Sequence, residues 1–208
     1  MSLIAFFGAL ESGLIYGLVA LGVLISFRTL DFPDLTADGS FPLGGAVAGV
    51  SIVAGVNPWL ACAFGMLAGS VAGVVTALLH VKLGILQLLA SILVMVALYS
   101  VNLRIMGAPN LPLLGETTVF SSLVTNDNGF WMRCLIIGAV VILAKLFLDW
   151  FYSTESGLSM RATGSNLRMA QAQGINTSWM TIIGMAISNG LIALAGALFV
   201  QTQGGADI

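Results

Sequence analysis

The stretch WLACAFGMLAGSVAGVVTALLH, residues 59–80, decides the fold class of this chain. It contains no Asp, Glu, Lys or Arg, and as a helix it would be about 33 Å long, enough to cross the roughly 30 Å hydrocarbon core of a bilayer. Further apolar stretches lie at residues 3–27, 41–56, 83–103, 130–152 and 177–200. We therefore predict an all-α fold, a polytopic transmembrane helical bundle of about six spans that forms one domain over residues 1–208.

The composition agrees with a membrane protein. Hydrophobic residues make up 58% of the chain and charged residues 8%, whereas a soluble domain averages about 25% charged residues. A soluble fold of this size would lack the polar side chains needed to cover its surface. The formal charge of −2 supplies no basic stripe for phosphates, which argues against nucleic acid as a partner. Cys62 and Cys134 lie in apolar runs and are interpreted as small core residues.

Two features describe how the spans are expected to pack. The stretch 41–56 is short for a full crossing and is followed by Asn57 and Pro58, so this span is predicted to be tilted, broken or partly inserted. Glycines recur at four-residue spacing, most clearly at Gly65, Gly69 and Gly73. Small residues on one helix face let backbones approach closely in lipid. Such a face serves either the packing of this bundle or a dimer.

The distribution of Lys and Arg predicts the orientation. One side of the membrane receives Arg28, Lys82, Lys145, Arg161 and Arg168, and the other receives Arg104 and Arg133. Short loops rich in these residues stay in the cytoplasm. The predicted cytoplasmic segments are 28–40, 80–83 and 153–176, the N-terminus is predicted to lie outside, and 104–129, with Asn126, Asp127 and Asn128, is the predicted external loop.

Three carboxylates lie beside a proline between the first two spans. Asp31, Asp34 and Asp38 surround Pro33, which rules out a continuous helix there. Irregular backbone at membrane depth is tolerated where it is buried in protein or lines a wet cavity, as in the broken helices that bind solute in transporters. The segment is therefore either part of a translocation pathway or a solvated cytoplasmic turn.

Polar residues inside the spans give further candidates for the pathway. Glu11 lies in the first span, where a carboxylate either lines a pathway or reaches back to the outer interface. Asn102 and Asn189 lie in later spans and either connect helices by hydrogen bonds or contact solute. His80 stands alone, without a cluster at ligand spacing, so no metal site is predicted.

The segment 153–176 is predicted to form two short helices. The first runs from near Ser156 to Gly164, and the second is capped by Ser165 and ends at Gly174, since glycine readily adopts the left-handed conformation at a helix end. In the second helix Leu167, Ala170 and Gly174 are predicted to share a face that fits a groove on another protein, with Arg161 and Arg168 flanking it. The alternative is an ordinary interfacial loop with cytoplasmic arginines.

The sequence GLSMRATGSNLRMAQAQGIN at 157–176, followed by SNGLIALAGAL at 188–198, resembles the cytoplasmic coupling loop of bacterial ABC importer permeases. The branch it resembles is the branched-chain amino acid and ribose permease superfamily, and within it the permeases linked to tryptophan and other amino-acid uptake systems. SGLIYGLVALG at 12–22 and FRTLDFPDLTADGSF at 27–41 are similar to the same group. The resemblance extends over essentially the whole chain.

The resemblance implies a homodimeric permease of the bacterial inner membrane that imports a small polar solute such as an amino acid. It would dock on cytoplasmic ATP-binding subunits and receive solute from an extracytoplasmic binding protein. The chain would then be no enzyme and hold no cofactor, because ATP is hydrolysed on the partner. The residues that match the coupling motif are Gly157, Arg161, Gly164, Asn166, Ala170 and Gly174. Their implied role is to transmit the closure of the partner subunits.

A stand-alone secondary transporter or channel-like facilitator is the alternative function. It would need ion-coupling carboxylates inside the spans, where Glu11 is available. An internal repeat is compatible with either function: Gly13-Leu-Ile and Gly190-Leu-Ile open similar helices, and Asp31 and Asp207 follow at 18 and 17 residues, which predicts an inverted-topology repeat. Because similar permeases continue for further spans, we expect the chain to be a fragment or a truncated product.

Overall fold

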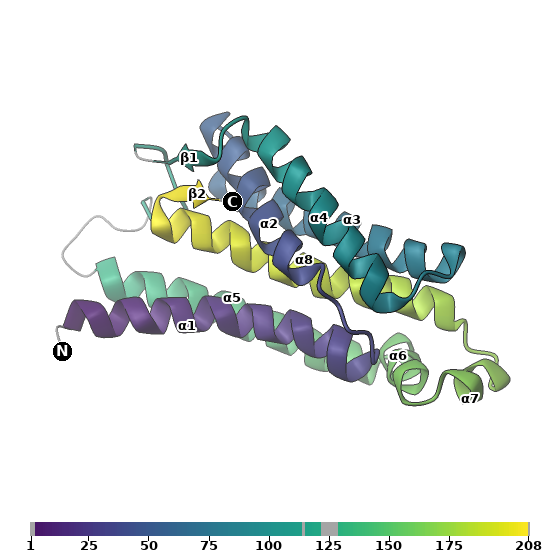
Figure 1. Cartoon of the computed structure of the whole chain (residues 1–208). Coiled ribbons are helices and arrows are strands. Elements are labelled where there is room, and N and C mark those ends of the chain that lie inside the picture. Colours follow the sequence, from purple (N-terminus) through teal and green to yellow (C-terminus); the bar gives the residue numbers. More distant parts are fainter. Residues whose placement is uncertain (1–2, 114, 122–128, 208) are drawn as a thin grey trace.

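The computed structural model describes residues 3–113, 115–121 and 129–207 (Figure 1). The predicted turn at Asn126, Asp127 and Asn128 lies outside these residues. The elements, in chain order, are α1 (Leu3–Val23), the π-helix η1 (Leu24–Thr29), α2 (Ala37–Val53), α3 (Pro58–Leu83), α4 (Gln87–Met106), β1 (Asn110–Pro112), α5 (Gly129–Ser153), α6 (Glu155–Ser165), α7 (Leu167–Ala172), α8 (Thr177–Gln203) and β2 (Gly205–Asp207).

The predicted bundle of membrane-spanning helices is confirmed. Within the described residues, α1, α3, α4, α5 and α8 are long and apolar enough to cross a bilayer, and α2 is a shorter apolar helix. Local chemistry sets several of their ends. The side chain of Asn57 accepts a hydrogen bond of 3.0 Å from the Trp59 N–H at the start of α3, and Gly84, with φ +68°, ends the same helix. Asn176 caps α8 in the same way as Asn57.

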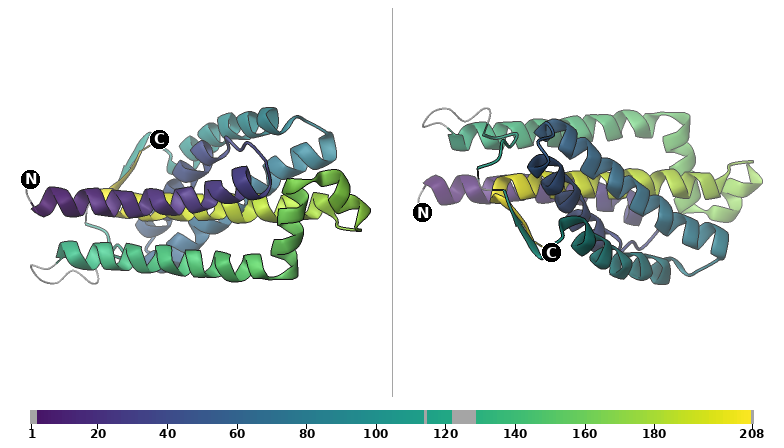
Figure 2. Two further views of the ribbon diagram at one scale, coloured as in Figure 1. Left: turned by 90° about the horizontal axis from the view of Figure 1, so that it is seen from below. Right: turned by 90° about the horizontal axis from the view of Figure 1, so that it is seen from above.

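Helix α8 lies at the centre of the bundle. Figures 1 and 2 show α1 and α5 side by side along one flank of α8, and α2, α3 and α4 on its other flank. In the apolar stretch of 18 residues taken from each helix, 67% of α8 is buried, against 22% of α5. Helices α1 and α8 run in opposite directions (Figure 1), and the hydroxyl of Ser188 on α8 donates to the Gly22 carbonyl of α1 over 2.8 Å.

The most extensive helix contact is between α3 and α8. Gly65, Gly69 and Gly73 all lie on the face of α3 that meets the rest of the core. A Cβ atom at Gly69 would touch Ala193 and the Asn189 carbonyl, and one at Gly73 would run into the Met185 carbonyl. A Cβ at Gly65 would lie 3.2 Å from the Cβ of Ala197. These three positions therefore leave no room for a side chain.

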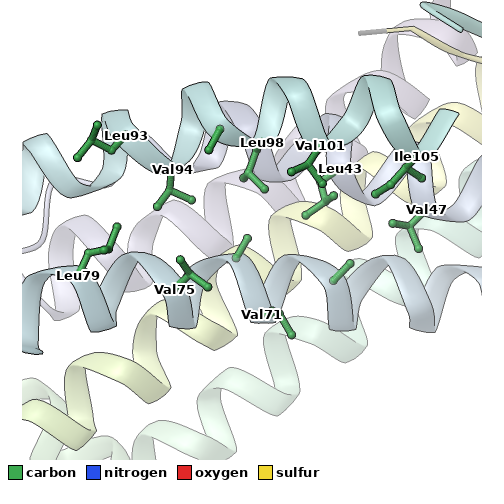
Figure 3. Close-up of a pocket in the computed structure, with 13 residues that line it drawn as sticks. Leu43, Val47, Val71, Val75, Leu79, Leu93, Val94, Leu98, Val101 and Ile105 are labelled. Atoms are coloured by element: carbon green, nitrogen blue, oxygen red, sulfur yellow. The ribbon is translucent and has the colours of Figure 1, made fainter. Parts of the chain in front are cut away.

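Helix α4 packs less closely against α3, and an apolar groove of about 650 Å³ lies between them. Figure 3 shows side chains of both helices pointing into this space, with Leu43 and Val47 of α2 behind them. All thirteen lining residues are Ala, Val, Leu or Ile. The groove therefore suits hydrocarbon rather than a polar solute.

A two-stranded antiparallel ribbon lies at the end of the bundle opposite α6 and α7 (Figure 1). Asn110, Leu111 and Pro112 pair with Asp207, Ala206 and Gly205, respectively. The predicted inverted repeat compares α1 with α8. Helix α1 is followed by the π-helix η1, whereas α8 is followed by the strand β2. The two segments differ as soon as their apolar parts end.

The packing of Gly69 predicts opposite effects for one substitution at two positions. Gly69→Ala places a methyl group into the α3–α8 contact and should lower the free energy of unfolding by about 2 kcal/mol. Gly13→Ala, where no atom lies within 4 Å of the added Cβ, should be neutral or stabilise by about 0.5–1 kcal/mol because alanine favours helix. Thermal unfolding of both variants in detergent measures this, and an equal response at both positions contradicts the packing argument.

Candidate functional site

The first candidate site is the junction between η1 and α2. Residues 30–36 are not helical, as Pro33 predicted. Phe32 is 1% exposed and packs edge-on against the His80 ring, with 5.4 Å between the ring centroids. The hydroxyl of Thr36 lies 2.9 Å from the hydroxyl of Thr76. Because His80 and Thr76 are one turn apart on α3, the segment 32–36 runs along α3 into the bundle.

The depth of this junction explains why the second span is short. Thr76 lies seven residues before the end of α3, which is about 10 Å along the helix axis. Helix α2 starts one residue after Thr36, so it begins inside the depth covered by α3 rather than at the end of the bundle. The expectation of a tilted, broken or partly inserted second span is met in one respect: α2 is a single continuous helix of 17 residues that begins inside the depth covered by α3, after η1 has ended.

A buried polar network holds the junction to α8. One oxygen of Asp34, Oδ1, accepts from the Thr36 N–H over 2.8 Å, and the other, Oδ2, accepts from Asn189 Nδ2 over 2.8 Å. The Ser40 hydroxyl donates to Asn189 Oδ1 over 2.7 Å, and Asn189 Nδ2 also donates to the Met185 carbonyl over 3.2 Å. Asp34 is 3% exposed, and Ser40 and Asn189 are fully buried. Both oxygens of this carboxylate are thus bound by neutral donors.

Asp38 and Asn102 come together at a second place. They line a cavity of about 470 Å³ between α2 and α4. Asp38 is in the first turn of α2 and is exposed, whereas Asn102 of α4 is fully buried and its Nδ2 donates to the Gly39 carbonyl over 3.4 Å. The other lining residues are Gly39, Pro42, Met95, Val96 and Tyr99.

Glu11 and Asp31 lie apart from both of these sites. Glu11 is on α1, where it interacts electrostatically with Arg133 of α5. Asp31 has a left-handed backbone, with φ +52°, and lines a cleft with Arg28 and Arg161 at the α6–α7 end. The structure therefore joins Asp34 to Asn189 by a hydrogen bond and places Asp38 and Asn102 on one cavity, and it leaves Glu11 and Asp31 in two further places.

The second candidate site is the pair of short helices, α6 and α7. The Thr154 side chain accepts from the Gly157 N–H over 3.3 Å at the start of α6. The predicted cap of the second helix is wrong: Asn166, not Ser165, accepts from the Met169 N–H over 3.0 Å, and the Ser165 hydroxyl donates back to the Ala162 carbonyl. Gly174 follows α7 with φ +81°, as a glycine that ends a helix should.

Helix α6 is braced against its neighbours through glycines. A Cβ at Gly157 would run into the Phe151 carbonyl, and a Cβ at Gly164 would run into the Thr29 carbonyl of η1. The first helix ends one residue beyond the expected Gly164, but Gly164 is not in the left-handed conformation; its lack of a side chain is required by the close approach of η1. The guanidinium of Arg161 lies 4.8 Å from the centre of the Tyr152 ring, and the Tyr152 hydroxyl is 2.9 Å from that of Thr29.

The exposed face of α7 differs from the predicted one. Ala170 is 3% exposed and therefore packs within this chain instead of sharing an outward face with Leu167. The large outward side chains are Leu167, 52% exposed, and Met169, 62% exposed. Arg168 and Gly174 are also exposed. Helix α7 thus carries exposed apolar and cationic side chains.

The two candidate sites are physically continuous. Helix α6 contacts both η1 and α8, and η1 leads directly into the 30–36 segment. Leu30 packs against Gly184 of α8, where a Cβ would lie 3.2 Å from the Leu30 Cγ. Rigid packing therefore connects the Gly164–Thr29 contact to the Asp34–Asn189 network.

Several residues of these sites were not expected from the sequence. Thr36, Ser40 and Thr76 complete the polar junction, and Tyr99 lines the Asp38 cavity. Tyr152 supports α6. Hydroxyl residues are common in membrane helices and often bond to the backbone of their own helix, as Thr76 also does. The sequence alone therefore does not separate the hydroxyl residues of a site from the others.

Long apolar helices around a short helix that begins at a buried polar junction define a multi-pass membrane protein with the general plan of a transporter. The chain belongs to the family described as branched-chain amino acid transport system / permease component, whose model matches residues 5–208. The predicted resemblance to this superfamily is therefore confirmed.

The relatives carry related names. A tyrosine transport system permease protein of Clostridioides difficile is 41% identical over 96% of this chain and 65% of its own length. A probable branched-chain amino acid transport permease protein LivH of Methanocaldococcus jannaschii is 27% identical over 93% of this chain and 66% of its own length. An autoinducer 2 import system permease protein LsrC of Yersinia enterocolitica is 26% identical over 90% and 51%, respectively.

This chain thus spans about two thirds of the length of the first two of these relatives. No solved structure matches it.

The Asp34–Asn189 hydrogen bond predicts the outcome of exchanging the two residues. Asn189→Asp alone places two buried carboxylates in contact and should lower the free energy of unfolding by on the order of 3 kcal/mol or more. The exchanged pair, Asp34→Asn with Asn189→Asp, keeps one amide donor facing one carboxylate and should recover most of that loss. Thermal unfolding of the single and double variants in detergent measures the recovery. A double variant no more stable than Asn189→Asp contradicts the assigned bond.

Proposed function

We propose that this chain is the membrane-spanning permease part of an ATP-binding-cassette importer that moves an amino acid or a similar small polar solute. The observation that carries the proposal is the α6–α7 pair, which presents exposed side chains. Gly164 of α6 packs against η1, and η1 leads into the non-helical residues 30–36. The relatives named for tyrosine transport, branched-chain amino acid transport and autoinducer 2 import support it.

In this proposal the α6–α7 end faces the cytoplasm of a bacterial cell and the membrane is the inner membrane. Lys82 ends α3 at this end, and Arg161 and Arg168 lie on α6 and α7. Arg104, in the last turn of α4, and Arg133, near the start of α5, lie toward the other end of the bundle. The excess of cationic residues supports this orientation, because basic loops remain in the cytoplasm. The N-terminus is then outside.

Three partners complete the proposed importer. A cytoplasmic ATP-binding subunit binds the exposed side chains of α7, among them Leu167 and Met169, and it hydrolyses the ATP. An extracytoplasmic solute-binding protein delivers the solute to the opposite end. A second permease copy forms the other half of the pathway. The chain itself contributes mechanical coupling rather than catalysis.

The proposed coupling follows the contacts of α6. A displacement of α7 moves α6, whose Gly164 backbone lies on the Thr29 carbonyl of η1. A shift of η1 pulls on residues 30–36 and hence on the hydrogen bond between Asp34 and Asn189. Rigid-body movement of packed elements is a common way to switch a transporter between two facings. A secondary carrier is less favoured, because Glu11, its candidate ion-coupling group, lies on α1 and takes no part in the hydrogen bonds of the junction.

Co-purification tests the docking face. Tagged wild-type permease, extracted in mild detergent from its native host, should bring down a P-loop ATPase. Gly174→Leu, which forces a side chain into the φ +81° position, and Met169→Glu, which charges the exposed apolar face, should each reduce the recovered ATPase on the order of tenfold.

The matched control is Gly84→Leu. Gly84 also has a left-handed backbone, with φ +68°, and open space around it, but it lies in the α3–α4 turn. This variant should retain the ATPase. Equal loss in Gly84→Leu, or full retention in both Gly174→Leu and Met169→Glu, would falsify the docking assignment.

The Gly164 contact predicts a variant that binds the ATPase without transporting. Gly164→Ala pushes α6 away from the Thr29 carbonyl but leaves the outward face of α7 unchanged. Solute uptake into cells should fall on the order of tenfold or more while ATPase recovery stays near wild type. Ser165→Ala, which alters an exposed neighbour, is the control. Parallel loss of uptake and ATPase recovery in Gly164→Ala would show that the contact is needed for assembly rather than for coupling.

A further inference from the structure

We infer that the cavity between α2 and α4 binds the primary ammonium group of a small solute, with the Asp38 carboxylate and the Asn102 side-chain oxygen as the acceptors. This inference rests on the proposed function and names the chemistry of the transported solute at one site. The two residues lie on different helices, and the cavity they line has a volume of about 470 Å³.

The place of Asp38 is unfavourable for a lipid-facing residue. The adjacent Gly39 lies against the middle of α4, where an added Cβ would be 3.2 Å from the Leu98 Cβ and 3.3 Å from the Met95 Cα. Asp38 is therefore beside the middle of a membrane-spanning helix, yet its side chain is exposed in this chain. A carboxylate at such a depth faces a wet cavity or a polar partner rather than hydrocarbon.

Asn102 supplies a second and independent sign of a ligand. It is fully buried, and its Nδ2 must face the Gly39 carbonyl, which can only accept. Its Oδ1 is consequently fixed as the free acceptor, and this oxygen has no hydrogen-bond partner in the described part of the chain. A buried acceptor without a donor is unfavourable, and because Asn102 lines the cavity, a donor bound there is the partner inferred for this oxygen.

The lining residues select the kind of donor. One acceptor is charged and the other is neutral, and in the described residues no Lys or Arg lines the cavity. This arrangement favours a cation that donates several hydrogen bonds, as a primary ammonium does, and disfavours an anion. Pro42, Met95 and Val96 provide apolar walls, and the ring of Tyr99 offers a face for a cation or an aromatic side chain. The volume is in the range of small-molecule sites.

Charged thiol reagents test the cavity without knowledge of the solute. Val96→Cys is placed in a background with Cys62→Ala and Cys134→Ala, in membrane vesicles that contain the full chain. The probes are aminoethyl methanethiosulfonate, which carries a primary ammonium, and the anionic sulfonatoethyl reagent. The cationic reagent should label the introduced thiol on the order of tenfold faster, and Asp38→Asn should remove most of this preference. Leu67→Cys, on an exposed face of α3, is the lipid-facing control and should react slowly with both.

Protection by amines then tests the ligand class. Tyramine, which keeps the ammonium, should slow the labelling of the Val96→Cys thiol severalfold, whereas 3-(4-hydroxyphenyl)propionate, which lacks it, should not. Protection should be lost in Asp38→Asn and weakened in Asn102→Ser, and thermal unfolding checks that each variant is folded. Absence of labelling by either reagent, a charge preference that survives Asp38→Asn, or equal protection by both compounds would overturn the inference. Because no step needs an ATPase, this failure is distinguishable from failure of the proposed importer.

Discussion

The close approach of backbones along α8 is the constraint on which the rest of the structure depends. In lipid there is little hydrophobic force between helices, so dispersion contacts and hydrogen bonds must hold the bundle. A Cβ at Gly44 on α2 or at Gly69 on α3 would run into Ala193 of α8, and one at Gly196 of α8 itself would run into the Phe41 carbonyl of α2. This contact fixes Ser188 and Asn189 at the depth where the first two spans meet.

The side-chain amide of Asn189, held at that depth, stabilises the non-helical junction between η1 and α2. Residues 30–36 leave the helical ladder, and their polar groups need partners that hydrocarbon does not offer. Asn189 provides one partner to Asp34 and another to Ser40, and Thr76 provides one to Thr36. The same break directs Asp38 away from this network and toward α4. One carboxylate thus holds the junction together, while the other remains available to a solute.

The two ends of the proposed mechanism meet at η1. A π-helix is a rare element and is often found at functional positions. Here it carries the Thr29 carbonyl that receives α6 and continues into the segment that contains Asp34. The tyrosine at position 152 supports both η1, through the Thr29 hydroxyl, and α6, through Arg161. In the proposed mechanism, this shared contact carries a movement at the α7 surface to residues 30–36 through packed elements.

The sequence by itself determined the membrane class, the spans, the break at Pro33 and the glycine after α7, because these depend on local hydropathy and backbone preference. It also named six candidate pathway residues, of which four lie at the two polar places described above, but it did not give their pairing. Only the tertiary structure decided that Asp34 binds Asn189, that Asp38 and Asn102 line one cavity, that Ala170 is buried, and that Gly164 serves close approach. These outcomes depend on which helices become neighbours, and similar apolar spans leave that choice open until they pack.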